Sequence, residues 1–110
     1  MVECKVDLDI VFQSLADATR RDILKRVSQK ELSISELFKP YEKKMSFAAV
    51  AKHVQVLESA RLIEKRREGK QQIIRMEPKM VRTASLELEK YAQMWEERFD
   101  ALDAVLKSSH

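Results

Sequence analysis

The sequence is poor in the residues that mark secreted and membrane-bound proteins. Its 110 residues include one cysteine, Cys4, and one glycine, Gly69. A single cysteine cannot form an intramolecular disulfide, and it fits a reducing compartment. No apolar run reaches the roughly 20 residues that span a bilayer, and charged residues stand at the N-terminus where a signal peptide needs an apolar stretch. These absences predict a cytoplasmic protein with no membrane partner.

Internal repeats, low-complexity segments and flexible linkers are absent too, so residues 1–110 are expected to form a single domain with one core. The net charge of this domain is only +3, but it is unevenly spread. Residues 46–76 hold seven Lys or Arg against three Glu, whereas residues 77–110 hold five basic against seven acidic residues. A basic middle favours a polyanion held on one face. The alternative interpretation is a solvated charged surface.

Helix signals dominate the first part of the chain. Apolar residues at helical spacing predict a first helix over residues 6–15. Asp17 can cap a second helix, because its carboxylate accepts the unpaired amide hydrogens of a first turn. Ser33 and Glu36 have capping-box spacing and open a short third helix, which Pro40 ends. The residues that follow predict a polar connection.

The most informative stretch runs from residue 46 to residue 76. A helix over about residues 46–60, capped by Ser46, has apolar side chains on one face and small side chains on another. Two strands follow over about residues 62–67 and 71–76, with Glu68-Gly69 in the turn between them. A small-faced helix can lie close in a DNA major groove, and a basic hairpin beside it can grip phosphates or the minor groove.

A long last helix is predicted over residues 78–106, roughly 40 Å in length, with Pro78 in its first turn. Apolar residues recur along it every seven positions, and such a seam usually needs a partner helix. Residues 8–76 form too small a core to cover it, so we expect a dimerisation helix. The aromatic residues of the seam could instead line a ligand pocket. The residues predicted for the dimer interface are Val81, Leu88, Tyr91, Trp95, Phe99, Leu102 and Leu106.

Several segments, taken in order, resemble one family. Residues 15–24, Leu-Ala-Asp-Ala-Thr-Arg-Arg-Asp-Ile-Leu, resemble the opening signature of the arsenic-repressor (ArsR) family of transcription regulators. Residues 31–37, 50–57 and 65–70 are similar to its next segment, its recognition helix and its wing. The tail over residues 91–106 resembles a branch whose long last helix makes the dimer. The resemblance implies a mainly α fold with a two-stranded β-wing: a winged helix-turn-helix with a long C-terminal dimerisation helix.

The sequence departs from this family at three places. Ala18 stands where a proline is usual, and Arg61 stands where a glycine normally ends the recognition helix. A left-handed cap at Arg61 would therefore be strained or replaced. The connection over residues 39–45 is longer than the turn of a minimal helix-turn-helix, which bears on the angle between its two helices.

The resemblance also raises the question of metals, because many members of the family sense metal ions. Ser33 and Ser35 stand where paired cysteines would be expected, and the last helix has no histidine before His110. A zinc or thiophilic site needs several Cys or His ligands in one shell, but Cys4, His53 and His110 lie in unrelated segments. We therefore predict no metal site and no cofactor.

His53 is a lone histidine on the predicted recognition helix. No motif supplies a nucleophile or a carboxylate partner for it, so an enzyme is not indicated. Two interpretations stay open for His53: a hydrogen bond that braces the helix, and a contact to a DNA phosphate. Cys4 is either inert or the site of a disulfide between the two copies of a dimer.

Together these features predict a homodimeric repressor that binds a palindromic operator in double-stranded DNA through two equivalent helices. Gln55 can pair bidentately with adenine, whereas the wing cations serve mainly affinity. Phe47 either touches a thymine methyl or turns back into the core. The alternative is a winged-helix protein-interaction module with an incidental basic face. No inducer is identified by these residues. The predicted DNA-binding residues are Ser46, Phe47, Ala48, Ala51, Lys52, His53, Gln55, Arg66, Arg67 and Lys70.

Overall fold

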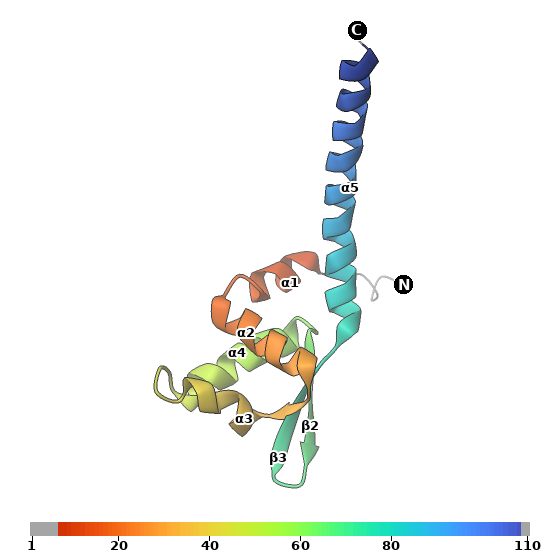
Figure 1. The fold of residues 1–110 in the computed structure, drawn as a ribbon. Helices are drawn as coiled ribbons and strands as arrows, with labels where there is room; N and C mark the ends of the chain where they lie inside the picture. Colours follow the sequence, from red (N-terminus) through yellow and green to blue (C-terminus); the bar gives the residue numbers. More distant parts are fainter. Residues whose placement is uncertain (1–6, 109–110) are drawn as a thin grey trace.

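The computed structural model describes residues 7–108, in which helices and a small sheet form a head and one long helix projects from it (Figure 1). The extents are 71 × 40 × 21 Å. The predictions for Cys4, Val6 and His110 lie outside the described residues. The mainly α fold with a wing and a long last helix is confirmed. Its elements are α1 (Leu8–Ser14), α2 (Ala18–Gln29), β1 (Leu32–Ser33), α3 (Ile34–Phe38), a 3₁₀ turn (Lys39–Tyr41), α4 (Phe47–Ser59), β2 (Ile63–Glu68), β3 (Gln71–Met76) and α5 (Pro78–Ser108).

Side-chain caps start α2, α3 and α4 where the sequence predicts them. Asp17 and Ser46 each accept a hydrogen bond of 3.1 Å from a backbone N–H of the following first turn. Ser33 and Glu36 exchange the two bonds of a capping box at 2.8 and 3.1 Å. These bonds with Ser33 lower the pKa of the Glu36 carboxyl. Each cap satisfies amide groups that a helix start leaves unpaired.

β2 and β3 form the predicted hairpin in antiparallel register. Its last pair is Glu68 with Gln71, so the turn is Gly69-Lys70 and not the predicted Glu68-Gly69. Gly69 has φ +60°, in the left-handed region that two-residue hairpin turns favour. The glycine of this chain therefore stands where the backbone needs one.

A third strand, β1, extends the sheet beyond the two strands that the sequence predicts. Leu32 pairs with Ile74 and Ser33 with Ile73, which gives the strand order β1-β3-β2. A strand of two residues has no periodicity of its own for sequence analysis to detect. β1 fixes the start of α3 to the same sheet that carries the wing.

One core joins the four helices of the head, the sheet and the first turns of α5. The central side chain of α2 is Ile23, and that of α4 is Val54; both are fully buried. Burying an aliphatic side chain of this size contributes about 1.5–3 kcal/mol. The core consists of Val11, Ile23, Val27, Leu32, Leu37, Val50, Val54, Leu57, Ala60, Leu62, Ile63, Ile74, Met80 and Ala84.

The face that α1 buries differs from the apolar stripe that the sequence predicts. It begins after the cap Asp7, whose side chain accepts a hydrogen bond from the N–H of Ile10 at 3.2 Å. Val11 is buried, but Ile10 and Phe12, which the periodicity assigns to the same apolar face, are exposed. α1 packs against both α4 and α5, and Ile10 lines a groove shared with α4.

The connection after α3 is more ordered than its polar composition predicts. Pro40 ends α3 but lies within the 3₁₀ turn, and Tyr41 and Met45 pack against the core. The Tyr41 hydroxyl donates a hydrogen bond to Asp22 of α2. Burial, together with this bond, raises the pKa of Tyr41 to about 12. The connection is therefore anchored to α2 and fixes the position of α3 against that helix.

α4 ends in a residue with left-handed backbone, Arg61, whose φ is 62°. The N–H of Leu62 donates to the carbonyl of Leu57 at 3.1 Å, and the N–H of Arg61 donates to the carbonyl of Glu58 at 2.9 Å. These two bonds form a Schellman motif. The left-handed cap is thus kept and strained, with an arginine in the place that favours glycine.

Candidate nucleic-acid interface

α4 turns an apolar face to the core and a polar face to solvent. Val50, Val54 and Leu57 are fully buried. The exposed side chains of α4 follow one another at steps of three or four residues, which aligns them along one side of a helix. Half-buried Ala51 lies beside this stripe and keeps it flat. The stripe consists of Ala48, Lys52, Gln55 and Ser59.

Phe47, at the start of α4, is predicted either to face a thymine methyl or to turn back into the core, and its observed position is intermediate between the two. Its ring packs edge-to-face against Phe38, with ring centroids 5.3 Å apart and an interplanar angle of 78°. The side chain is nevertheless 46% exposed. Phe47 thus leans on α3 while keeping an apolar edge at the solvent-facing start of α4.

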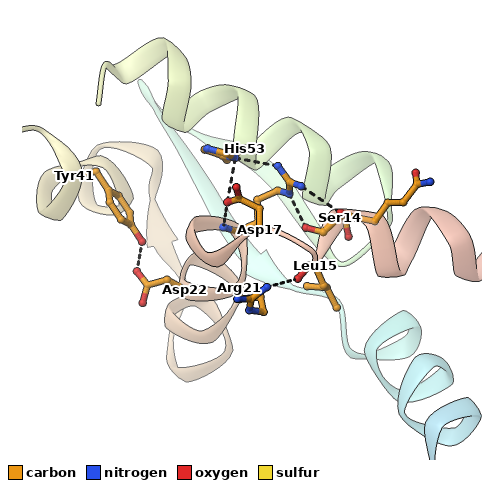
Figure 2. Close-up of polar contacts among 9 residues, drawn as sticks. Ser14, Leu15, Asp17, Arg21, Asp22, Tyr41 and His53 are labelled. Atoms are coloured by element: carbon orange, nitrogen blue, oxygen red, sulfur yellow. Dashed lines mark hydrogen bonds and ion pairs between the residues drawn. The ribbon is translucent and has the colours of Figure 1, made fainter. Parts of the chain in front are cut away.

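His53 faces α2, away from the exposed stripe of α4. Its Nδ1 lies 3.2 Å from Nη1 of Arg20 and 3.9 Å from Oδ2 of Asp17, and its side chain is 22% exposed. Figure 2 shows His53 and Asp17 in this contact between the two helices. The backbone hydrogen bond from Arg20 lowers the pKa of Asp17, and the charge of Arg20 lowers it further. This geometry favours the bracing interpretation over the phosphate contact.

Alternation along β2 separates the cations of the wing. Ile63 is buried, and Lys65 pairs with Glu58 of α4 at 3.1 Å, so both side chains point to the α4 side. Arg67 is the next residue on this side, and Lys70 lies in the turn. Neither Arg67 nor Lys70 has an ion pair within residues 7–108 of the structure. These two charges are therefore available to an anion.

The opposite face of the hairpin carries paired charges. Arg66 lies 2.7 Å from Glu31 and also contacts Glu68. Arg75 lies 2.9 Å from Glu64 and 3.7 Å from Glu31. The hydrogen bond from Arg66 lowers the pKa of Glu31. Arg66, predicted to contact DNA, is thus already neutralised by two carboxylates on the side away from α4.

α5 leaves the head after its first turns, and every residue from 88 to 107 is exposed. Trp95 and Phe99 pack edge-to-face with centroids 4.7 Å apart, yet they are 58% and 52% exposed. An open hollow of about 250 Å³ runs along them. Val81 differs from the other predicted interface residues, because it packs against the core of its own chain. The remaining predicted interface residues, Leu88, Tyr91, Trp95, Phe99, Leu102 and Leu106, are each more than half exposed.

Metal-ligating side chains do not gather in the described part of the chain: no three His, Cys, Asp or Glu lie close enough to hold an ion. Ser33, at one of the positions where family members have cysteine, is buried in the capping box. Among the helices of residues 7–108, none combines the length and the apolar character needed to cross a membrane.

Comparison with known proteins gives the family. No family model matches the chain. The uncharacterized HTH-type transcriptional regulator YuzN of Bacillus subtilis strain 168 is 38% identical over 71 residues, which cover 60% of this chain and 77% of that protein. The crystal structure of the ArsR family transcriptional regulator RHA00566 is 31% identical, with a TM-score of 0.74, and covers 81% of this chain and 90% of that one. The chain belongs to the ArsR family.

Two further solved structures extend the likeness of this ArsR-family protein. An ArsR-like transcriptional regulator from Rhodococcus sp. RHA1 is 26% identical, with a TM-score of 0.78, and covers 100% of this chain and 99% of that one. A homodimeric winged helix-turn-helix DNA-binding domain from Mycobacterium bovis is 26% identical, with a TM-score of 0.62, and covers 78% of each chain. This protein is a DNA-binding transcriptional regulator of the helix-turn-helix type and not an enzyme.

Two side-chain contacts of this ArsR-family regulator, made by Arg20 and by Glu31, were not predicted from the sequence. Arg20 joins α2 to His53, and Glu31 holds Arg66 and Arg75 from the residue before β1. Arg20 had a local signal, because two adjacent arginines soon after a helix can bind its unpaired terminal carbonyls. Glu31 had none, since its partners come from strands more than thirty residues away in the sequence.

Proposed function

We propose that this regulator is a homodimeric repressor, with α4 in the major groove and the β2–β3 wing on the adjacent backbone or minor groove. One observation carries the proposal: α4 presents an exposed stripe to solvent and packs against β2, the strand that carries Arg67, and neither Arg67 nor Lys70 forms an ion pair within residues 7–108. Small side chains allow a helix to approach base edges closely, and unpaired cations attract phosphates. The chain therefore offers reading and anchoring groups on neighbouring elements.

Within α4 the proposed roles differ from residue to residue. Gln55 lies in the middle of the exposed stripe and can bond adenine with two hydrogen bonds, a contact worth about 1–3 kcal/mol of discrimination. Lys52 is exposed beside it and suits a phosphate or a guanine edge. Phe47 offers its exposed edge to a thymine methyl. Ser46 acts by capping α4, and Ala48 and Ala51 act by being small.

The wing supplies affinity rather than sequence preference in this proposal. Arg67 and Lys70 carry it, because their charges are not matched by carboxylates of the described chain. Arg66 contributes less, since a phosphate would have to displace Glu31 and Glu68 from it. The proposal thus gives Arg66 less weight than Arg67 and Lys70.

Dimerisation through α5 supplies the second reading head. The exposed apolar side chains of α5 form a surface that a second copy can bury. The homodimeric Mycobacterium bovis domain supports the same assembly here. A two-fold dimer contacts two equivalent half-sites, which predicts a palindromic operator with half-sites about 10 base pairs, or a multiple, apart.

A binding experiment with two duplexes tests the proposal. The wild-type protein is first used to select a duplex from random DNA, and its affinity for this duplex and for a scrambled one is measured by fluorescence anisotropy over a range of salt. We expect tighter binding to the selected duplex, and binding to both that falls steeply with salt because counterions are released. Gln55→Ala should relax preference at one base of each half-site. Failure to bind either duplex at low salt would leave the protein-interaction alternative in place of this one.

A further inference from the structure

One guanidinium, that of Arg20, connects three helices of the head. Its Nε donates to the carbonyl of Ser14 at 2.6 Å, and its Nη2 donates to the carbonyl of Gln13 at 3.2 Å. Both carbonyls belong to the C-terminal end of α1, where helix carbonyls lack intrahelical partners and a cation is favourable. Its Nη1 faces Nδ1 of His53 on α4 at 3.2 Å. Arg20 itself stands in the first turn of α2.

The neighbouring Arg21 also binds a carbonyl at the end of α1. Its Nη1 donates to the carbonyl of Leu15 at 2.8 Å, just beyond the end of α1, and Figure 2 shows this bond on the side of α2 away from His53. Arg21 thus binds the end of α1 without reaching α4. The chain therefore contains its own control: two adjacent arginines bind the end of α1, and one of them also holds α4.

The contact to His53 is directional, whereas most of the packing of α4 is not. Val50, Val54 and Leu57 bury apolar surface, which stabilises α4 but resists small rotations weakly. A hydrogen bond loses strength steeply when its angle changes. Because a guanidinium can only donate, a hydrogen bond between these atoms requires Nδ1 of His53 to accept. A directional bond at this position opposes rotation of α4 about its own axis.

The same junction lies beside Gln55, and α1 links it to α5. Arg20 and Gln55 line one groove of about 390 Å³ between α1 and α4. α1 packs against α4 on one side and against α5 on the other. A change in the bonds of Arg20 is therefore expected to shift Gln55 relative to α5.

We propose that Arg20 is the positioning residue for DNA recognition: through His53 it sets the rotation of α4, and through the end of α1 it ties that rotation to the dimer. The inference rests on the proposed function, because it concerns how the same α4 meets DNA. Arg20 touches no base in this arrangement. It determines which base contacts are made, whereas Arg67 and Lys70 determine how tightly phosphates are held.

The first test compares Arg20→Lys with Arg21→Lys. Lysine keeps the charge but lacks the planar fork needed to reach two carbonyls and a ring nitrogen together. We expect Arg20→Lys to weaken binding to the selected duplex about ten-fold, the equivalent of one lost base contact, and to leave binding to the scrambled duplex unchanged. Arg21→Lys should change neither. Equal losses on both duplexes for Arg20→Lys, or equal effects of the two variants, would overturn the proposal.

The second test uses His53, in case Arg20→Lys does not fold. Asparagine can place an oxygen near the position of Nδ1, whereas leucine has no acceptor. We expect His53→Asn to keep more of the preference for the selected duplex than His53→Leu. Equal loss of that preference in the two variants, or an equal loss of affinity for both duplexes, would overturn the brace. A wild-type protein that binds neither duplex refutes the proposed function itself, a result distinct from either of these.

Discussion

At Arg61 a side chain occupies a backbone conformation that L-residues avoid. The left-handed region costs a residue with a Cβ about 1–2 kcal/mol. The residues on either side explain why the chain accepts this cost, because Leu57 and Leu62 are fully buried and are joined by the outer Schellman bond. Their burial, about 1.5–3 kcal/mol for each leucine, fixes the turn whatever residue stands at its apex.

We therefore expect Arg61→Gly to stabilise the protein. The glycine relieves the φ of 62°, and the greater freedom of glycine in the unfolded chain cancels part of the gain, which leaves about 0.5–1 kcal/mol. Urea denaturation followed by circular dichroism measures the change. Arg61→Ala is the matched control, because alanine removes the guanidinium but keeps the Cβ, and its stability should stay near that of the wild type. A glycine variant no more stable than the alanine variant would show that the cap is unstrained.

The cations of the wing differ in the partners they already have, and this difference can be measured. We expect Arg67→Ala and Lys70→Ala each to reduce the slope of log affinity against log salt by about 0.9, the value for one lost phosphate contact. Arg66→Ala should change the slope much less, since Glu31 and Glu68 neutralise Arg66 in the free protein. Equal slopes for all three variants would mean that DNA displaces both carboxylates from Arg66.

At the scale of elements, the structure separates what is local in sequence from what is not. Asp17, Ser33 and Ser46 cap helices through bonds to residues three positions away, so their spacing alone predicts three helix starts. The missed strand β1 exists only because Ile73 and Ile74 return beside it forty residues later. The same holds for Arg20 and His53, which meet across 33 positions. Fold and reading helix were predictable, whereas the contacts that orient them were not.

The capping box of α3 predicts a loss of stability in acid. The hydrogen bonds with Ser33 lower the pKa of Glu36 from its usual 4.5. A lowered folded-state pKa gives stability that is present above about pH 4.5 and is lost as the pH falls through the lower, folded value. Glu36→Gln can keep the box, because glutamine also accepts from the cap N–H, but it does not titrate. Thermal melts should therefore show a smaller acid-induced drop in Tm for Glu36→Gln than for the wild type. The exposed Glu42→Gln is the control and should behave like the wild type.

At the scale of the whole molecule, packing within the head does not account for the length of α5. Its 31 residues extend over about 46 Å, but only its first turns enter the core through Met80 and Ala84. Val81, the first residue of the predicted seam, belongs to the head, so the seam available to a partner starts with Leu88. Leu86 is also exposed, at 60%, but helical geometry places it on a different side of α5 from Trp95 and Phe99.

The last prediction uses these two sides of α5. We expect the double variant Trp95→Asp, Phe99→Asp to be a folded monomer. A two-fold interface contains each of these side chains once from each copy, and the unpaired charges of the replacements cannot be buried there. Its α4 and wing are unchanged, yet binding to the selected duplex should collapse, since one head reaches only one half-site. Leu86→Asp adds the same charge on the other side of α5 and should remain a dimer that binds normally. Sedimentation measures the oligomeric state of the wild type, the double variant and Leu86→Asp, and fluorescence anisotropy measures their affinity for the selected duplex. A monomeric double variant that binds the duplex as tightly as the wild type would show that α5 serves a purpose other than pairing the reading heads.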